Sequence, residues 1–287
     1  MRSQSSSSSL TPASGLTLET RLLASVIVPV LLLAFVLLYF WPDRTEQLFA
    51  WTIKPSMTPM WMGGGYLAGT YLFLCVLFAK RWQTVAPAIM GVLAFVLSMA
   101  LATVLHWDRF NHSHPMFWLW AGVYAVSPIL ILSVVLRNWR LDSGTPMAID
   151  TVVPTILRWI IGIFFGIYFL LGALMFLWPD VGISLWPWKL TPLTARVVAG
   201  WLLLPGVGGL VMVSDRRWSA WRITIQTASI WWVLNLVAFF RAWNDFDSSN
   251  PKTWIFVGAM AVSLIGYLGF HLGMDLAALK AQRATAV

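Results

Sequence analysis

Hydrophobic residues run through the chain in eight long, continuous stretches that short polar segments separate. Each stretch is close to the 20 residues that a helix needs to cross the hydrocarbon core of a bilayer. Because the apolar pattern is continuous rather than alternating, helices are the predicted spanning form. The sequence therefore predicts an all-α, polytopic membrane protein of about eight transmembrane helices. The stretches cover residues 22–41, 60–79, 84–106, 116–136, 154–177, 196–214, 221–241 and 254–274.

Composition and charge agree with this class. Of 287 residues, 59% are hydrophobic and 10% are charged, whereas soluble domains carry about 25% charged residues. The net charge of +8 comes from bases that are scattered singly or in pairs, which excludes a nucleic-acid surface. The predicted partners are the lipid bilayer and other membrane protein subunits. No charged residue lies in the middle of a stretch, which disfavours ion-coupled transport.

The distribution of basic residues predicts the orientation in the membrane. Twelve of the 19 Lys and Arg residues fall on the side that holds both termini, including the pairs Lys80-Arg81 and Arg216-Arg217. Loops on the cytoplasmic side carry an excess of Lys and Arg. Both termini are therefore predicted to be cytoplasmic.

The two halves of the chain repeat each other. Trp41-Pro42-Asp43 recurs as Trp178-Pro179-Asp180, an offset of 137 residues, and Arg81-Trp82 recurs as Arg217-Trp218, an offset of 136. Constant offsets at rare residue types indicate a duplication. Because each copy has an even number of spans, the two four-helix repeats are predicted to cross the membrane in the same sense, around a pseudo-twofold axis along the membrane normal.

This duplication predicts five parts of the chain. The polar composition of the first part predicts disorder. The parts are a Ser-rich tail at 1–18, a first transmembrane repeat at 19–140, a cytoplasmic linker at 141–153, a second transmembrane repeat at 154–275 and a cytoplasmic tail at 276–287.

Two Gly-x-x-x-Gly patterns fall within the apolar stretches. They are formed by Gly65 with Gly69 and by Gly162 with Gly166. Small residues at this spacing let two membrane helices approach closely. Both patterns therefore predict close helix packing.

Three of the four histidines lie in one outer loop, which offers the candidate chemistry. His106, His112 and His114 occur there with Asp108 and Arg109, and the matching loop of the second repeat has no histidine. Neutral imidazole and carboxylate groups suit zinc or copper, so His106, Asp108, His112 and His114 form a hypothetical metal site. Two alternatives stay open: a site for another ligand that includes Arg109, and a loop that caps helices and meets lipid headgroups.

Other repeated residues are predicted to have a structural role at equivalent places in the two repeats. A Trp-x-x-x-Pro segment follows the first and the fifth helix and is predicted to form a short re-entrant turn. A quinone or lipid headgroup pocket between these two loops is the alternative. The residues are Trp51, Pro55 and Trp107 in the first repeat and Trp188, Pro192 and Trp243 in the second.

Residues 49–55, 105–110 and 186–196 resemble a group of uncharacterised bacterial multi-pass integral membrane proteins of unknown function. The resemblance extends over most of the chain after the serine tail. It implies a bacterial cell membrane location, and it implies no activity.

The sequence favours a non-enzymatic scaffold or binding component of a membrane complex, with a polar, histidine-bearing site at its outer face. The first alternative is a passive transporter or channel for a neutral or lipid-like substrate, with its path between the two repeats. The second alternative is a metal-dependent enzyme at the outer face. No catalytic residue is predicted, and the hypothetical cofactor is a metal ion.

Overall fold

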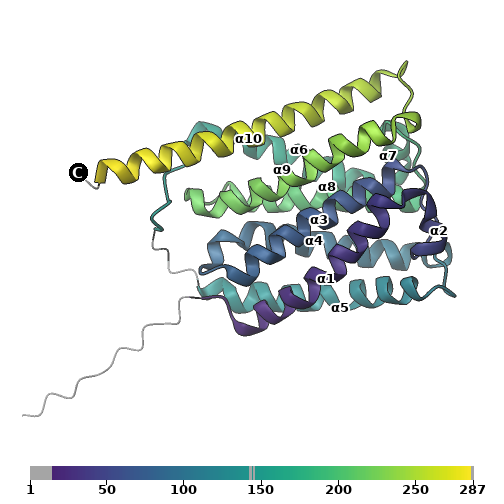
Figure 1. Ribbon diagram of the computed structural model, residues 1–287, viewed down its shortest axis with the longest axis horizontal. Helices are drawn as coiled ribbons and strands as arrows, with labels where there is room; N and C mark the ends of the chain where they lie inside the picture. Colours follow the sequence, from purple (N-terminus) through teal and green to yellow (C-terminus); the bar gives the residue numbers. More distant parts are fainter. Residues whose placement is uncertain (1–14, 142–143, 145, 286–287) are drawn as a thin grey trace, which may run out of the picture.

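The computed structural model describes residues 15–141, 144 and 146–285. Its regular structure is helical, and eight helices are long and apolar enough to span a membrane (Figure 1). The predicted all-α fold of eight membrane-spanning helices is thus confirmed. The helices are α1 (Leu18–Phe40), α3 (Met57–Phe78), α4 (Ala86–Leu105), α5 (Pro115–Asn138), α6 (Thr155–Leu177), α8 (Pro192–Met212), α9 (Trp218–Arg241) and α10 (Pro251–Thr285).

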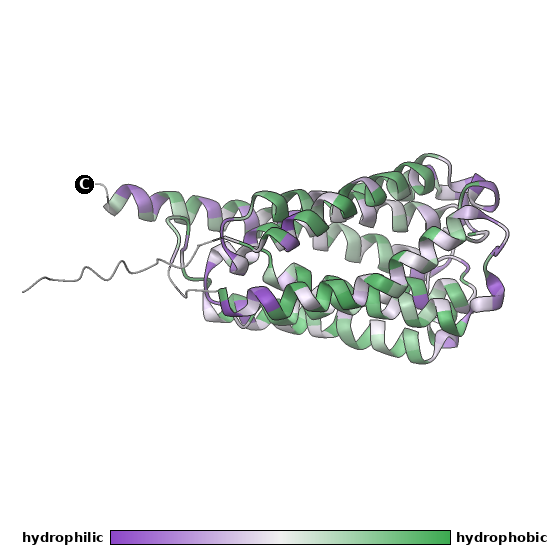
Figure 2. Cartoon of the chain, turned by 90° about the horizontal axis from the view of Figure 1, so that it is seen from below, coloured by the Kyte–Doolittle hydropathy of each residue, from purple (hydrophilic) through white to green (hydrophobic). Residues whose placement is uncertain are grey.

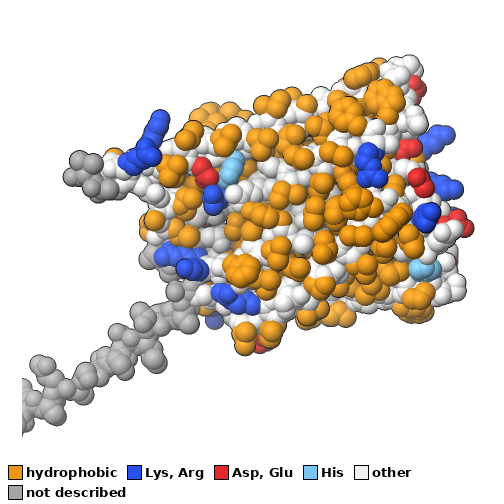
Figure 3. Space-filling view, in the orientation of Figure 1, with side chains coloured by type: hydrophobic (Ala, Val, Ile, Leu, Met, Phe, Trp, Pro, Cys, Tyr) orange, Lys and Arg blue, Asp and Glu red, His pale blue; other side chains and the backbone are white. Residues whose placement is uncertain are grey.

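The helices form one bundle with two polar ends. The start of α1 and the end of α10 lie at the same end, here called the terminal end (Figure 1). The opposite end, here called the loop end, carries the short helices α2 (Thr45–Leu48) and α7 (Pro179–Leu185). Hydrophilic segments gather at both ends (Figure 2), and hydrophobic side chains cover the face between them (Figure 3). This is the surface that a bilayer solvates.

Four helices form the centre of the bundle. The apolar windows of α3, α4, α8 and α9 are 39% to 67% buried, whereas those of α1, α5, α6 and α10 are 17% to 28% buried. Helix α1 packs on α3 as α6 packs on α8, and α4 packs on α5 as α9 packs on α10. Across the centre, α4 contacts α8 and α3 contacts α9. Exchanging each helix for its counterpart in the other half turns every one of these contacts into another observed contact. This pattern is the one expected from the predicted pseudo-twofold axis.

Two arginines at the terminal end repeat the same interaction. Arg21 of α1 donates hydrogen bonds to the carbonyls of Leu77 and Ala79 at 2.6 and 2.9 Å. Arg158 of α6 donates to the carbonyl of Val213 at 2.9 and 2.6 Å. These carbonyls lie at the C-terminal ends of α3 and α8, where they have no partner within the helix. The offset from Arg21 to Arg158 is 137, and that from Leu77 to Val213 is 136, so this geometry supports the predicted duplication.

Glycines bring the central helices together. A Cβ atom at Gly65 would lie 2.2 Å from the Trp201 ring, and one at Gly91 would lie 2.3 Å from the carbonyl oxygen of Leu204. The first Gly-x-x-x-Gly pattern therefore packs as predicted. The prediction is wrong for the second pattern, because a Cβ at Gly162 would make an ordinary contact and one at Gly166 would meet nothing within 4 Å.

The C-terminal segment differs from the predicted tail, and the linker packs on the bundle. Helix α10 continues to Thr285, so most of the predicted tail at 276–287 prolongs a helix. The linker packs on the start of α9, where Asp150 accepts a hydrogen bond from the Ser219 N–H at 2.9 Å. Of the predicted N-terminal tail, residues 1–14 lie outside the described residues, and Thr17 caps α1.

A polar network joins α9 and α10 in the part of the membrane nearest the terminal end. Asp275 accepts from the Trp218 indole at 2.7 Å and pairs with Arg222 at 3.1 Å. His271 lies 3.5 Å from the same carboxylate. Further from the end, Gln226 accepts from the Tyr71 hydroxyl at 2.6 Å. The network therefore anchors the peripheral helix α10 to the centre.

Candidate functional site

The ring of His114 closes the start of α5. Its Nδ1 accepts from the N–H of Met116 at 3.2 Å, and its Nε2 donates to the carbonyl of Gln47 at 2.9 Å. A side chain at this position satisfies one of the free N–H groups of the first helical turn. Both ring nitrogens of His114 are thus occupied by backbone groups.

His112 also bonds to the backbone of its own loop. It is exposed, and its Nε2 donates to the carbonyl of Trp107 at 3.1 Å. Its ring lies 5.2 Å from the Trp107 ring and 4.6 Å from the Phe117 ring. Asp108 and Arg109, on the short 3-10 helix Trp107–Arg109, are both exposed.

His106, just after α4, faces a cation of the second half. The Arg196 guanidinium donates to His106 Nε2 at 2.7 Å and to the Phe176 carbonyl at 3.0 Å. Burial and the positive charges of Arg196 and Arg109 hold the pKa of His106 below its ordinary value. The imidazole is therefore a neutral acceptor.

Within the described residues, no three His, Cys, Asp or Glu side chains form a group that could hold a metal ion. Each of the three histidines has a hydrogen-bond partner within the protein, and the bond from the Met116 N–H to His114 matches the alternative of a capping loop. The geometry gives the metal hypothesis no ligand set.

A pH dependence follows from His106. Because its folded pKa is lowered, the stability that it contributes is present above the unfolded pKa of about 6.5 and is lost as the pH falls through the folded value. Between pH 7.5 and pH 5, we expect the melting temperature in detergent to fall further for the wild-type protein than for the His106→Gln variant. Burial raises the pKa of Asp245, so the contribution of this carboxyl to stability increases as the pH falls. Asp245 is present in both proteins, so its contribution cancels in the comparison. Equal pH slopes would contradict the expected effect.

Trp51 and Trp188 lie at the centres of two matching aromatic clusters at the loop end. The Trp51 ring lies 5.1 Å from Phe49, 5.1 Å from Phe110 and 4.8 Å from Trp120. At the equivalent positions of the second half, the Trp188 ring lies 5.2 Å from Trp186, 5.5 Å from Phe246 and 5.3 Å from Phe256. These side chains fill the space under the re-entrant segments.

The other four repeated residues lie around these clusters. Trp107 and Trp243 begin matching 3-10 helices and are partly exposed. Pro192 is the first residue of α8, and Pro55 follows a cis peptide bond just before α3. All four positions are consistent with the predicted structural role.

The two clusters differ in one hydrogen bond. The Trp188 indole donates to the Thr58 hydroxyl of the first half at 2.8 Å, and both side chains are buried. The position equivalent to Thr58 is Ala195, which has no acceptor. Trp51 Nε1 is buried and without a partner. The exchange of Thr58 for Ala195 therefore explains why the Trp51 indole N–H is unpaired.

Thr58→Val tests the interaction. The shape of the side chain is kept while the buried Trp188 N–H loses its acceptor, which costs about 1–3 kcal/mol. We expect Thr58→Val to lower the melting temperature in detergent. Thr58→Ser keeps a hydroxyl acceptor and should keep the melting temperature of the wild type. If the valine and serine variants melt alike, the bond contributes nothing.

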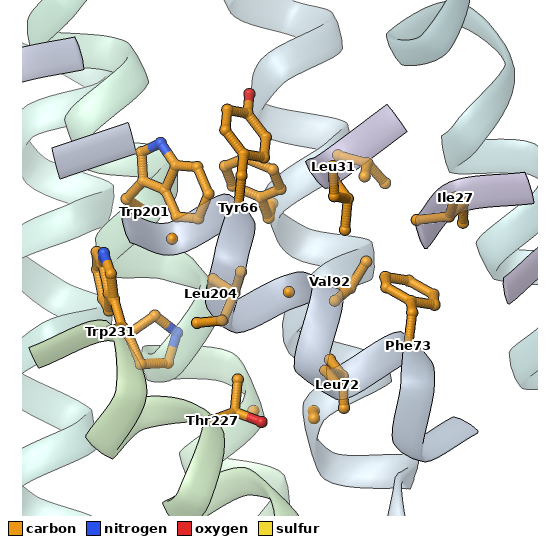
Figure 4. A pocket seen from close by; sticks show the side chains of 18 of the residues that line it. Ile27, Leu31, Tyr66, Leu72, Phe73, Val92, Trp201, Leu204, Thr227 and Trp231 are labelled. Carbon is orange, nitrogen blue, oxygen red and sulfur yellow. The ribbon is translucent and has the colours of Figure 1, made fainter. Parts of the chain in front are cut away.

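The described residues also line a cavity between the two halves, within the membrane-spanning part. Its volume is about 130 Å³. The walls come from α1, α3, α4, α5, α6, α8 and α9 and are almost wholly apolar. Ile27 and Leu31 of α1 lie across the cavity from Trp201 and Trp231 (Figure 4).

A few polar groups interrupt this apolar wall. The hydroxyls of Tyr66 and Tyr124 lie 2.9 Å apart. The hydroxyls of Ser127 and Thr224 and the indole N–H of Trp201 are buried and without a hydrogen-bond partner. Several other Ser and Thr side chains in these helices donate to a carbonyl of the preceding turn, as Thr227 and Ser229 do. A buried donor without an acceptor is costly, and a bound molecule with an acceptor atom removes that cost.

The cavity reaches the seam between α1 and α5, and the equivalent seam between α6 and α10 is filled. Three aliphatic residues of the first half correspond to aromatic residues of the second. The ring of Tyr267 lies 6.2 Å from Phe164 and 6.4 Å from Phe165, and Phe164 lies 4.8 Å from Tyr168. The equivalent pairs are Ile27 and Phe164, Leu31 and Tyr168, and Ile131 and Tyr267.

The sequence prediction of a site at the loop end missed this cavity. A signal was present in the predicted repeat, where large aromatic residues of the second half align with smaller aliphatic residues of the first. Such exchanges at buried positions change the filled volume of a core.

The fold thus defines a multi-pass membrane protein of the all-α class. No family model, no curated protein and no solved structure matches the chain.

Proposed function

We propose that this protein binds a neutral, lipid-soluble molecule within the bilayer, in the cavity between its two four-helix units. The observation that carries the proposal is a pair of buried, unpaired hydroxyls, Ser127 and Thr224, in an otherwise apolar wall. A few placed polar groups in an apolar cavity are typical of small-molecule sites.

The size of the cavity limits what enters it. An engineered cavity of about 150 Å³ holds a benzene ring, and this cavity measures about 130 Å³. It therefore accommodates one ring or the end of one hydrocarbon chain. The rest of a larger molecule extends along the open seam between α1 and α5.

This proposal develops the predicted binding component and relocates its site. The histidine-bearing loop bonds mainly to its own end of the bundle, so its geometry offers little to a ligand. The passive transporter for a lipid-like substrate shares the same cavity between the repeats. An apolar wall favours binding from the bilayer over passage of a polar solute.

The test uses the second half as the template for filling the first. Ile27→Phe with Leu31→Tyr introduces the residues found at 164 and 168 and fills the cavity. Protein purified in mild detergent is extracted with organic solvent, and co-purifying lipophiles are quantified by mass spectrometry. We expect one lipophile near equimolar amount in wild type and a loss of at least about tenfold in the filled variant, which corresponds to about 1.4 kcal/mol.

The matched control is Val26→Phe with Leu32→Tyr. It makes the same changes on the exposed side of α1, where Val26 is 64% and Leu32 is 43% exposed. It should retain the lipophile. Equal amounts in the filled variant and the wild type, or no lipophile in wild type, would refute the binding function.

The orientation and location belong to the same proposal: the terminal end faces the cytoplasm of a bacterial cell. The bias of Lys and Arg and the sequence resemblance support it. A C-terminal fusion to green fluorescent protein should fluoresce, and a C-terminal alkaline phosphatase fusion should be inactive. The reverse result would overturn the orientation.

A further inference from the structure

A second space lies in the seam between α1 and α5, close to the terminal end. Its volume is about 260 Å³. Glu19 and Arg137 lie at its polar side, 2.7 Å apart, and Ser133 lies one turn from Arg137. Apart from Thr20, its other lining residues are apolar: Leu23, Leu130 and Val134. The space therefore has a charged and an apolar side.

The lining of the cavity begins within about one turn of this space on both helices. Leu23 lies one turn from Ile27, and Leu130 lies beside Ile131, and both Ile27 and Ile131 line the cavity. From Arg137 to Val123, the cavity residue of α5 nearest the loop end, the helix rises about 21 Å at 1.5 Å per residue. That length exceeds one leaflet of a hydrocarbon core of about 30 Å.

A hydrogen-bond network bridges α1 and α5 at one end of the seam, and an aromatic contact lies at the other. At the terminal end, the Asn138 amide donates to the Thr20 hydroxyl at 2.7 Å and accepts from the Thr17 N–H at 3.2 Å. At the loop end, the Trp120 ring of α5 lies 5.7 Å from the Phe49 ring. The opening between these contacts therefore faces the bilayer.

We propose that the seam holds a zwitterionic glycerophospholipid from the leaflet at the terminal end. Its primary ammonium pairs with Glu19, its phosphate pairs with Arg137 and Ser133, and one acyl chain follows the seam into the cavity. This inference rests on the proposed function and names its ligand class.

The charges of the pocket fit this headgroup. The Glu19 and Arg137 side chains are 60% and 58% exposed, and an exposed ion pair contributes little to stability, so the two groups can exchange partners readily. A guanidinium binds phosphate oxygens through two parallel hydrogen bonds. An anionic headgroup would satisfy Arg137 but would leave Glu19 beside a second negative charge.

The experiment compares phosphatidylethanolamine with phosphatidylglycerol of the same acyl chains, added to delipidated full-length protein and quantified by native mass spectrometry. We expect wild type to prefer phosphatidylethanolamine by about threefold, the scale of one exposed ion pair. Glu19→Gln should lose this preference, and Arg137→Gln should bind both lipids less. The control Arg140→Gln, an exposed base outside the pocket, should behave as wild type. Equal binding of the two lipids by wild type, or unchanged binding by Arg137→Gln, would overturn the assignment.

A phosphatidylethanolamine with a photoactivatable diazirine near the end of one chain tests the depth of the chain. In wild type we expect crosslinks to cavity residues, and in Ile27→Phe with Leu31→Tyr we expect their loss. If the headgroup variants act as expected but no crosslink reaches the cavity, the chain does not enter it. If the crosslinks occur without headgroup selectivity, the cavity binds lipid and the headgroup assignment fails alone.

Discussion

Gly91→Val should lose most of its resistance to thermal unfolding in detergent. A Cβ at this position would lie 2.3 Å from the Leu204 carbonyl oxygen and 3.3 Å from the Gly208 nitrogen. These are backbone atoms, so no side chain can move aside, and α4 must separate from α8. Overpacking of a core costs about 1–3 kcal/mol where side chains yield, and here we expect about 3 kcal/mol or more. Gel filtration monitored by tryptophan fluorescence after heating measures the effect.

Gly166→Val is the matched control. The residue lies in the middle of membrane helix α6, and a Cβ there would meet nothing within 4 Å. Its melting temperature should stay close to that of wild type. A similar loss in both variants would show that valine disturbs these helices without regard to packing.

Asp275→Leu should detach α10 from the bundle at the terminal end. The change leaves the buried Trp218 indole and the Arg222 guanidinium without their shared acceptor. An unpaired buried donor costs about 1–3 kcal/mol, and the partly exposed ion pair adds little. We therefore expect a loss of about 2 kcal/mol, seen as a lower melting temperature and as faster proteolysis near residue 275.

Asp275→Asn separates the hydrogen bond from the charge. The asparagine oxygen still accepts from Trp218, so this variant should retain more than half of the lost stability. If the asparagine and leucine variants are equally destabilised, the ion pair with Arg222 is the main contribution.

Much of the architecture could be predicted from the sequence because lipid imposes one simple rule on it. Apolar stretches of bilayer length gave all eight spanning helices, and their ends differ from the predicted ends by a few residues except in α10. Helix α10 extends beyond the apolar stretch, because Ala, Leu, Lys, Gln and Arg after residue 275 favour a helix in water as well. The matched bonds of Arg21 and Arg158 are consistent with the offsets of the repeat.

The site was less predictable, because it depends on volumes and unpaired atoms rather than on residue type. Histidines in a loop suggest metal ligands, yet the partners of His112 and His114 are backbone groups, and sequence spacing does not reveal such partners. Likewise, nothing in the sequence distinguishes the unpaired Ser127 from a Ser that bonds within its helix. Gly166 shows the same limit, since a Gly-x-x-x-Gly pattern indicates a smooth helix face but does not say whether a neighbour occupies it.

The aromatic side chains between α6 and α10 have a mechanical consequence for the whole bundle. The rings of Phe164, Tyr168 and Tyr267 pack against one another, whereas the equivalent Ile27, Leu31 and Ile131 line a cavity. Thermal fluctuations of the bundle should therefore be larger between α1 and α5 than between α6 and α10. The two halves would then differ in stiffness, and the proposed ligand would enter and leave between α1 and α5.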